Sequence, residues 1–362
     1  MQQKIIERVR TLRAELHSLA ELSGQEHKTK AHLVKFLQQN TTLQIDDRGA
    51  WFCALHQEPS ARETIAFRAD MDAVPVADGG AAHLCGHDGH SAVLAGLGLL
   101  LEGMWLGKNI VLIFQHAEET GEGARACCRA LEDYRVSSIY AFHNIPGWPA
   151  GTVLLRSGTF ACASMGMMLT FSGVPSHAAY PENGVNPGYA AARVMAALPK
   201  LLQKTKKEGL TMATLIGSQI GAKAFGTAAG RAEVWLTLRA WHEADMLALR
   251  QAIEQTAHDE ARQDGVAFSC ALCDVFPATV NNNAMLAALE RVCRQADLAC
   301  IDVAEPFRWS EDFGCYGSMA RAVLVGIGAG ESWPQLHTPD YCFNDEIIPQ
   351  GLRLFFALAQ GG

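Results

Sequence analysis

The sequence predicts an α/β protein with a mostly parallel central sheet, helices on both faces of that sheet, and an inserted ferredoxin-like α+β domain. Short apolar runs typical of strands alternate with helical stretches in the outer parts of the chain, which indicates a parallel sheet. Residues 165–274 instead follow the order β-α-β-β-α-β, which can bury a core of its own. The 362 residues are enough for about two domains.

The first element is a pair of surface helices. Apolar residues recur at helical spacing over residues 4–22 and 27–39, so each helix has one buried face. The elements that follow alternate between strand and helix: strands are expected at 64–67, 109–114, 138–142 and 322–325, and helices at 91–101 and 123–132.

The middle of the chain forms the inserted domain, which we place at residues 165–274. It separates the two parts of a discontinuous catalytic domain, residues 1–164 and 275–362. The expected elements of the insertion are a strand at 166–172, a helix at 187–206, strands at 211–220 and 231–241, a helix at 243–264 and a strand at 266–273.

Composition narrows the classes of function. The chain carries 30 Lys and Arg against 38 Asp and Glu, and its cations are not clustered, so nucleic acid is not expected as a main partner. The N-terminal segment is charged and amphipathic, so a secretory signal is not expected. No apolar stretch approaches the roughly 20 residues that cross a bilayer, so a membrane partner is not expected either. The 11 Cys residues lack the regular spacing of a disulfide framework, which favours reduced thiols and a cytoplasmic location.

Three of the predicted strands lead into carboxylates or imidazoles. Asp70 follows the first strand, Glu118 and Glu119 follow the second, and His143 follows the third. The carboxyl ends of strands in an open α/β sheet line one crevice. We therefore expect these side chains to converge.

Two further segments add metal-ligating residue types. Cys85 and His87 stand one residue apart in a glycine-rich turn, and His337 lies near the C-terminus. Cys, His and Glu suit Zn²⁺, Mn²⁺ or Co²⁺ better than Mg²⁺. We predict a metal site, with two ions as the favoured arrangement. The alternative is that the histidines are ordinary residues of the core or the surface.

The adjacent Glu118 and Glu119 suggest a mechanism. In an extended segment neighbouring side chains point to opposite sides, so one carboxylate can bind a metal while the other faces the open site. The free carboxylate can then act as a general base toward water activated by the metal. This reasoning leaves open which Glu has which role, and the alternative is a solvated acidic loop before a helix.

Six motifs occur in order along the chain. They are Arg68-Ala-Asp-Met-Asp-Ala-Val-Pro75, Cys85-Gly-His-Asp-Gly-His90, Gln115-His-Ala-Glu-Glu-Thr-Gly-Glu-Gly123, Ser176-His-Ala-Ala-Tyr-Pro181 with Gly184-Val-Asn-Pro187, Ser310-Glu-Asp-Phe313 and Leu336-His-Thr-Pro339. Together they resemble the amidohydrolase branch of the aminoacylase-like dinuclear metallopeptidases. That branch includes hippurate hydrolases, N-acetyl-diaminopimelate deacetylases and indole-3-acetyl-amino acid hydrolases.

The resemblance implies a role for each matching residue. Glu118 matches the family's general base, and Asp70 matches a carboxylate that orients a ligand near the metals. The family binds two divalent ions per subunit, for which Zn, Mn, Co and Ni are the candidates. The residues that match its metal ligands are Cys85, His87, Glu119, His143 and His337.

The resemblance also implies residues outside the metal site. His177 matches a His that reaches an active site, often that of the other subunit, so a homodimer formed through the inserted domain is expected. Arg239 is a weaker candidate for binding a substrate carboxylate. The alternatives are a turn-capping His and a solvated strand charge. Two positions depart from the family pattern: the loop at 76–82 is shorter, and His116 stands where Pro is more common.

The function expected from these residues is a metal-dependent amidohydrolase that cleaves the amide bond of N-acyl amino acids. One alternative is a dipeptidase or carboxypeptidase on the same scaffold. A second is a non-catalytic paralogue that binds a metal or an N-acyl amino acid. A degenerate binder is expected to lose the base or a ligand, and all six matching positions are filled here.

Overall fold

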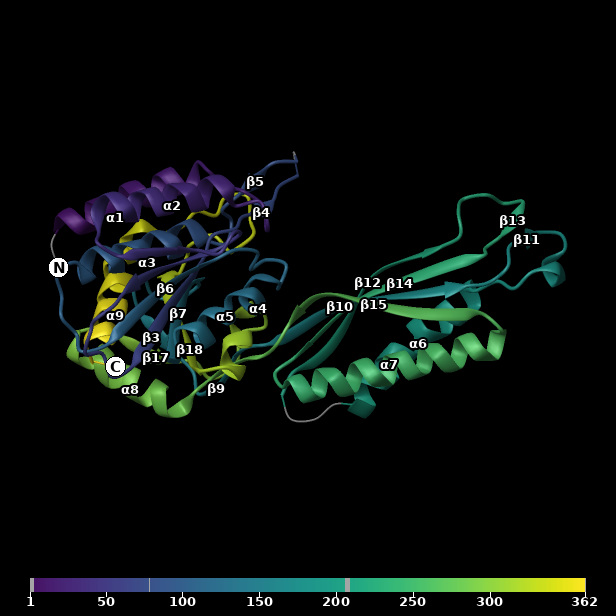
Figure 1. Cartoon of the computed structure of the whole chain (residues 1–362). Coiled ribbons are helices and arrows are strands. Elements are labelled where there is room, and N and C mark those ends of the chain that lie inside the picture. Colours follow the sequence, from purple (N-terminus) through teal and green to yellow (C-terminus); the bar gives the residue numbers. More distant parts are fainter. Residues whose placement is uncertain (1–2, 78, 206–208, 362) are drawn as a thin grey trace. The chain divides into compact units, whose positions relative to one another are not determined.

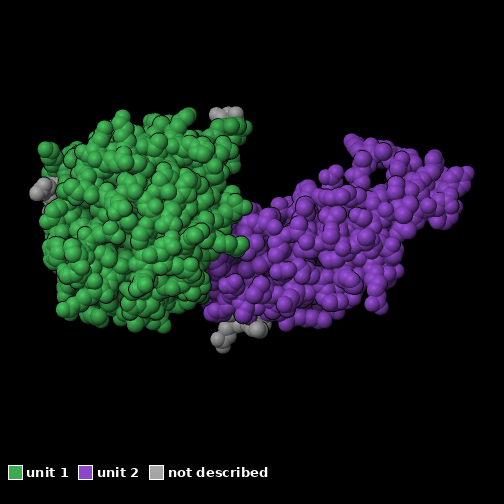
Figure 2. Space-filling model, viewed as in Figure 1, with its two compact units in different colours: residues 1–160, 279–306, 311–362 green, residues 161–278, 307–310 purple. Residues whose placement is uncertain are grey.

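The structure is a computed structural model, and it describes residues 3–77, 79–205 and 209–361. The chain divides into two compact units (Figure 2). Unit 1 comprises Met1–Phe160, Thr279–Pro306 and Glu311–Gly362, and unit 2 comprises Ala161–Ala278 and Phe307–Ser310. The segment expected as an insertion lies within unit 2, and the chain passes between the units at 160/161, 278/279, 306/307 and 310/311.

An eight-stranded sheet forms the centre of unit 1 (Figure 1). Its strands are β1 Gln44–Asp47, β2 Phe52–His56, β3 Thr64–Asp70, β6 Asn109–Gln115, β7 Val136–Pro146, β8 Val153–Leu155, β17 Cys300–Asp302 and β18 Arg321–Gly330. They lie in the order β1-β2-β6-β3-β7-β18-β8-β17. The four central strands β6, β3, β7 and β18 are parallel, whereas β1 with β2, β2 with β6, and β18 with β8 are antiparallel. The mostly parallel central sheet is thus confirmed.

Helices cover both faces of this sheet. The larger ones are α1 Gln3–His17, α2 His27–Asn40, α3 His87–Leu101, α8 Asn283–Gln295 and α9 Ile348–Gly361. Their apolar residues share one buried cluster with alternate residues of the strands, including Phe67, Leu112 and Phe142. The short helices α4 (Gly123–Cys127) and α5 (Arg129–Asp133) contact β6 and β7, and no described residue of theirs belongs to that cluster. They therefore lie on the opposite face, because side chains alternate across a strand.

Unit 2 has the ferredoxin-like order that the sequence predicts. Its main elements are β10 Ala163–Ser172, α6 Gly188–Thr205, β12 Thr211–Ile220, β14 Arg231–Ala240, α7 Glu243–Asp264 and β15 Ala267–Phe276. The four strands form an antiparallel sheet in the order β12-β14-β10-β15. Both helices pack on it around an apolar cluster that includes Leu169, Val194 and Leu249. The fold class is therefore confirmed for the insertion as well.

Short elements complete both units. They are β4 Val74–Pro75, β5 Ala81–Ala82, β9 Gly158–Ala161, β11 Ser176–His177, η1 Pro181–Asn183, β13 Thr227–Ala228, β16 Thr279–Asn281, η2 Asp312–Ser318 and η3 Asp345–Ile347. Within the described ranges, no helix combines the length and the apolar character needed to span a membrane.

Candidate functional site

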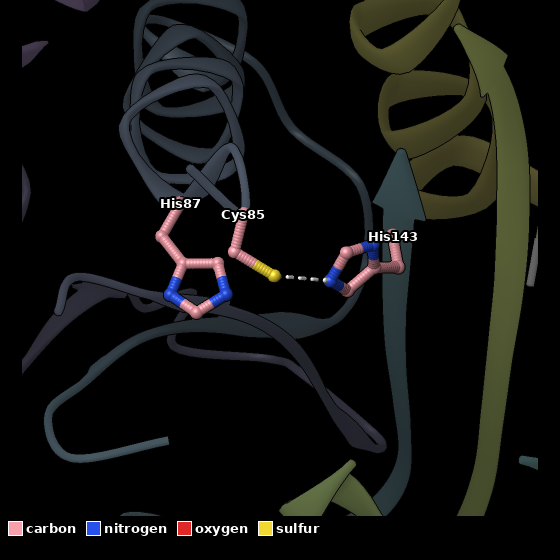
Figure 3. Close-up of side chains that lie close together, drawn as sticks. All are labelled: Cys85, His87 and His143. Carbon is pink, nitrogen blue, oxygen red and sulfur yellow. Dashed lines mark hydrogen bonds between the residues drawn. The ribbon is translucent and has the colours of Figure 1, made fainter. Parts of the chain in front are cut away.

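The start of α3 and the strand β7 bring three metal-type ligands together. His87 is the first residue of α3, Cys85 lies two residues before it, and His143 projects toward both from β7 (Figure 3). The Cys85 Sγ lies 3.4 Å from the His143 Nε2. The Nδ1 of His143 is 2.8 Å from the backbone carbonyl of Asn144, to which it donates, so the Nε2 is the nitrogen left to face the sulfur.

A glycine makes this turn possible. Gly86 has a φ of +93°, in the left-handed region that residues with a side chain rarely adopt. A Cβ at this position would lie 2.4 Å from the Asn144 Oδ1 and 2.7 Å from the Tyr341 hydroxyl. Gly86 therefore sets the direction of both Cys85 and His87, on either side of it.

The predicted ligands form overlapping clusters. In each cluster the possible ligand atoms lie within 4.8 Å of one another: Cys85 with His87 and His143, Cys85 with Glu119 and His337, and His87 with Glu118 and Glu119. Through these shared members, unit 1 brings together all five residues that the resemblance marks as ligands, together with the expected base.

Several atoms in the cluster suit a cation. The Nε2 of His87 and the Oε1 of Glu119 are buried without a hydrogen-bond partner and lie 3.8 Å apart, and the His337 Nε2 lies 3.4 Å from the same Glu119 oxygen. Buried polar atoms without a partner are costly unless something else binds them. A thiol, imidazoles and carboxylates are the ligands that divalent transition metals prefer, so the residues present fit such ions.

The segment with Glu118 and Glu119 is not extended, and the expectation that their side chains point to opposite sides is wrong. Ala117 has a φ of +48°, and the Gly121 N–H donates to the Glu118 carbonyl at 2.8 Å, which closes a turn. Both carboxylates consequently face one imidazole. The His87 Nε2 lies 4.0 Å from Glu118 Oε2 and 3.8 Å from Glu119 Oε1.

Asp70 and Asp72 have different partners. The carboxylate of Asp70 accepts hydrogen bonds from Arg68 at 2.6 Å and from His90 at 2.7 Å, and its Oδ2 lies 3.8 Å from the His87 Nε2. The Nδ1 of His87 is 3.2 Å from the Asp72 Oδ1 and 3.0 Å from the Asp72 carbonyl. Asp72 is therefore the carboxylate in contact with the far nitrogen of this ring. It follows the same predicted strand as Asp70, to which the resemblance assigned the orienting role.

Asp72 also fixes the turn that carries the two glutamates. Its Oδ2 accepts from the Glu119 N–H at 2.9 Å and from the Ser23 hydroxyl at 2.7 Å. Burial would raise the pKa of Asp72, yet the hydrogen bonds from His87 and Glu119 hold it below its ordinary value. One ionised carboxylate thus orients His87 and Glu119, which come from distant parts of the chain.

Burial shapes the protonation of the cluster. It raises the pKa of Glu118 well above its ordinary value, and the neighbouring charges of Glu311 and Glu119 raise it further. Burial also raises the pKa of the Cys85 thiol and lowers that of His143, so the imidazole is neutral and able to ligate. A nearby cation would offset the cost of the buried thiolate and carboxylates.

His177 and Arg239 both lie in unit 2. The Nδ1 of the exposed His177 accepts from the Ala179 N–H at 3.0 Å, as in a turn-capping histidine. One guanidinium nitrogen of Arg239 donates to the Ser310 hydroxyl at 2.9 Å and to the Arg308 carbonyl at 3.1 Å. Neither residue belongs to the metal-type clusters found among the described residues, so their roles stay predictions.

His116 and the loop at 76–82 are the two positions that depart from the family pattern. The Nδ1 of His116 is buried without a hydrogen-bond partner, and burial lowers its pKa, but the ring belongs to none of the clusters found among the described residues. The loop contains a turn in which the Val76 N–H donates to the Gly80 carbonyl at 3.1 Å. Residue 78 lies outside the described residues.

A mostly parallel α/β sheet with Cys, His and Glu gathered near its strand ends, in a chain with a second α+β unit, defines a two-unit protein with a candidate metal site. The chain belongs to peptidase family M20/M25/M40, whose profile matches residues 66–361, and it is a hydrolase of that family. The match confirms the resemblance inferred from the six motifs.

Known proteins agree with this assignment. An uncharacterized hydrolase of Staphylococcus epidermidis is 26% identical over 358 residues, which cover 93% of each chain. The YXEP protein of Bacillus subtilis, described as a dinuclear metal binding peptidase from the M20 family, superposes with a TM-score of 0.83 and 23% identity over 99% of this chain and 98% of that one. The aminobenzoyl-glutamate utilization protein of Klebsiella pneumoniae gives a TM-score of 0.78 and 20% identity over 99% and 96%.

Proposed function

We propose that this chain is a metal-dependent amidohydrolase that cleaves the amide bond of N-acyl amino acids. The observation that carries the proposal is the position of Glu118. Its buried carboxylate lies 4.0 Å from the unpartnered His87 Nε2, beside the metal-type ligands. A carboxylate at that place, with a raised pKa, has the position and the proton affinity of a general base.

The residues proposed to hold two divalent ions are Cys85, His87, Glu119, His143 and His337. Bound ions of this kind polarise a carbonyl group and lower the pKa of water, which is the chemistry the protein alone lacks. Asp72 keeps the His87 ring in place by accepting from its Nδ1, so that the Nε2 faces the cluster.

Proton transfer is proposed to pass through one oxygen of Glu118. The Oε1 accepts from the backbone N–H of Asp312 at 3.3 Å, whereas the Oε2 faces His87. The Oε2 would accept a proton from the attacking water and donate it to the leaving amine nitrogen. The products are a carboxylic acid and a free amino acid.

The substrate class rests on the resemblance and on one relative. Aminobenzoyl-glutamate, which names the Klebsiella pneumoniae protein, is itself an N-acylated amino acid. We propose that Arg239 and His177 bind the substrate carboxylate or the developing oxyanion, in a cytoplasmic homodimer formed through the inserted unit. A dipeptidase or carboxypeptidase is the second candidate, because the Bacillus subtilis protein is described as a peptidase.

A substrate panel separates these two candidates. Purified protein loaded in turn with Zn²⁺, Mn²⁺, Co²⁺ and Ni²⁺ is given N-acetyl, N-benzoyl and indole-acetyl amino acids alongside dipeptides with a free amino group. We expect the N-acyl amino acids to be cleaved faster with at least one metal. Faster cleavage of the dipeptides would replace the amidohydrolase proposal with the peptidase one.

The role of Glu118 is tested by Glu118→Gln, with Glu122→Gln as the control. Glu122 lies four residues further on, is exposed, and belongs to none of the clusters found among the described residues. We expect Glu118→Gln to keep its metal by elemental analysis and to lose about 10²–10⁴-fold in kcat, because only the proton acceptor is removed. Full turnover by this variant would refute the assignment of the base.

A further inference from the structure

A buried polar cluster lies next to Glu118, and its side chains have no role in the chemistry proposed above. It belongs to unit 1 and joins residues that are far apart in sequence. Each of its side chains is no more than 2% exposed. The members are Arg68, Gln115, Thr279, Glu311, Asp312 and Tyr316.

One peptide group of this cluster is hydrogen-bonded to Glu118. The N–H of Asp312 donates to the Glu118 Oε1 at 3.3 Å, and the carbonyl of Glu311, in the same peptide, accepts from the Thr279 hydroxyl at 3.3 Å. Because a trans peptide is planar, its C=O and N–H point in opposite directions. Thr279 therefore holds this peptide from the side opposite to Glu118.

The side chain of Asp312 holds the same peptide in a second way. Its carboxylate accepts from Arg68 at 2.8 Å, from the Gln115 amide at 2.7 and 2.8 Å, and from the Ala124 N–H at 2.7 Å. Charge-assisted hydrogen bonds of this number leave the residue little freedom to rotate. The position of its backbone N–H follows from the position of its side chain.

Stability alone does not account for this arrangement. One guanidinium, that of Arg68, lies within 3.0 Å of the carboxylates of Asp70, Glu311 and Asp312. Burial raises the pKa of Asp312 to about 8, and buried ion pairs of this kind are often no more stable than apolar packing of similar volume. The contact that the cluster makes with Glu118 offers a specific reason for it.

We propose that Thr279 and Asp312 are positioning residues for Glu118. They hold the Glu311–Asp312 peptide so that its N–H binds Oε1 and leaves Oε2 directed at the His87 Nε2. The inference rests on the proposed function, since it assigns Glu118 the role of base. Neither residue shares a cluster with the five proposed metal ligands, although the carboxylate of Asp312 forms a cluster with those of Glu118 and Glu311.

The test uses substitutions that alter one group each in the full-length, metal-loaded protein. Thr279→Val removes the hydroxyl and keeps the shape, Thr279→Ser keeps the hydroxyl, and Asp312→Asn replaces one acceptor oxygen by a donor. Thr64→Val is the matched control. Thr64 is also a buried threonine of unit 1, but it begins β3 at the strand end opposite to Asp70, about 20 Å away at roughly 3.3 Å per residue.

The expected result is a fall in kcat on the fastest-cleaved member of the substrate panel. Thr279→Val and Asp312→Asn should each lose about 10- to 100-fold, with KM and metal content unchanged. The reason is that a displaced peptide loses the hydrogen bond from the Asp312 N–H to the carboxylate of Glu118, a charged group. Thr279→Ser should stay within about threefold of the unaltered chain, as should Thr64→Val, because the hydroxyl is kept or is remote. If Asp312→Asn does not fold, the three threonine variants decide the question.

Two outcomes would overturn the inference. In the first, the kcat of Thr279→Val equals that of the control Thr64→Val. In the second, Thr279→Ser loses as much as Thr279→Val, which would mean that packing and not the hydroxyl matters. Glu118→Gln distinguishes these failures from failure of the proposed function. If that variant is inactive while Thr279→Val is fully active, only the positioning role is wrong, whereas an active Glu118→Gln removes the basis of both.

Discussion

Replacing Gly86 by Ala tests how strictly the turn between Cys85 and His87 requires a glycine. The backbone φ of +93° costs a residue with a side chain about 1–2 kcal/mol. The new Cβ would also lie 2.4 Å from the Asn144 Oδ1, which is 2.6 Å from the His90 Nε2. Asn144 therefore cannot move aside without loss of a buried hydrogen bond, worth about 1–3 kcal/mol. The two contributions together predict a cost of about 2–5 kcal/mol.

Gly103→Ala is the matched control for backbone strain. Gly103 has a φ of +70°, and nothing lies within 4 Å of the Cβ it would gain, so only the strain of about 1–2 kcal/mol is expected. The measurement is the urea midpoint of the transition that includes unit 1, with the slope unchanged. Gly86→Ala should also bind less metal after dialysis, since Cys85 and His87 flank the glycine. Equal costs for the two variants would refute the steric part of the reasoning.

Three further predictions concern the surroundings of the site. Asp72→Asn should lower metal affinity about 10- to 100-fold by equilibrium dialysis, because His87 and Glu119 lose their shared acceptor, and unchanged affinity would contradict this. A chelator should abolish turnover and lower the Tm, and Zn²⁺, Mn²⁺ or Co²⁺ but not Mg²⁺ should restore both. The hydrogen bond to Asp88 raises the pKa of His17 in the folded protein. The stabilisation that this hydrogen bond gives is therefore present below about pH 6.5, and it is lost as the pH rises through the pKa of His17 in the folded state. His17→Asn should therefore lower the Tm more at about pH 5.5 than at about pH 9, and an equal effect at both would exclude this linkage.

Several elements are observed at or near the bounds that the sequence predicts. The strand expected at 109–114 is observed as Asn109–Gln115, and the strand at 211–220 and the helix at 243–264 are observed with those bounds. The antiparallel strands β1 and β2 were not predicted. β2 was missed although it is an apolar run with four buried residues among its five, whereas β1 is short and polar and has no buried residue among its four. For β1, pairing with β2 and not the local pattern decides the strand.

The candidate site divides in a similar way. Residue type was enough to select Cys85 and His87 as candidate metal ligands. For His143 the strand position added a second signal, since topology alone brings strand ends together. The turn at Glu118 was not predicted, because Ala117 adopts a left-handed conformation that its residue type disfavours. Asp72 stands in the same strand-end segment as Asp70, but its position in the sequence does not show that His87 and Glu119 are its partners. These partners become visible only in the folded chain.

The chain crosses between the two units four times, and this limits how either unit can be deleted or transferred. A deletion of Ala161–Ala278 alone would leave Phe307–Ser310 in the chain without the rest of unit 2. The deletion would remove the Cys162 N–H, which donates to the Phe307 and Trp309 carbonyls at 3.1 Å. It would also remove the guanidinium of Arg239, which donates to the Arg308 carbonyl. A graft of unit 2 onto another scaffold must accordingly carry two separate pieces of polypeptide. Simple exchange of one contiguous gene segment cannot transplant this module intact.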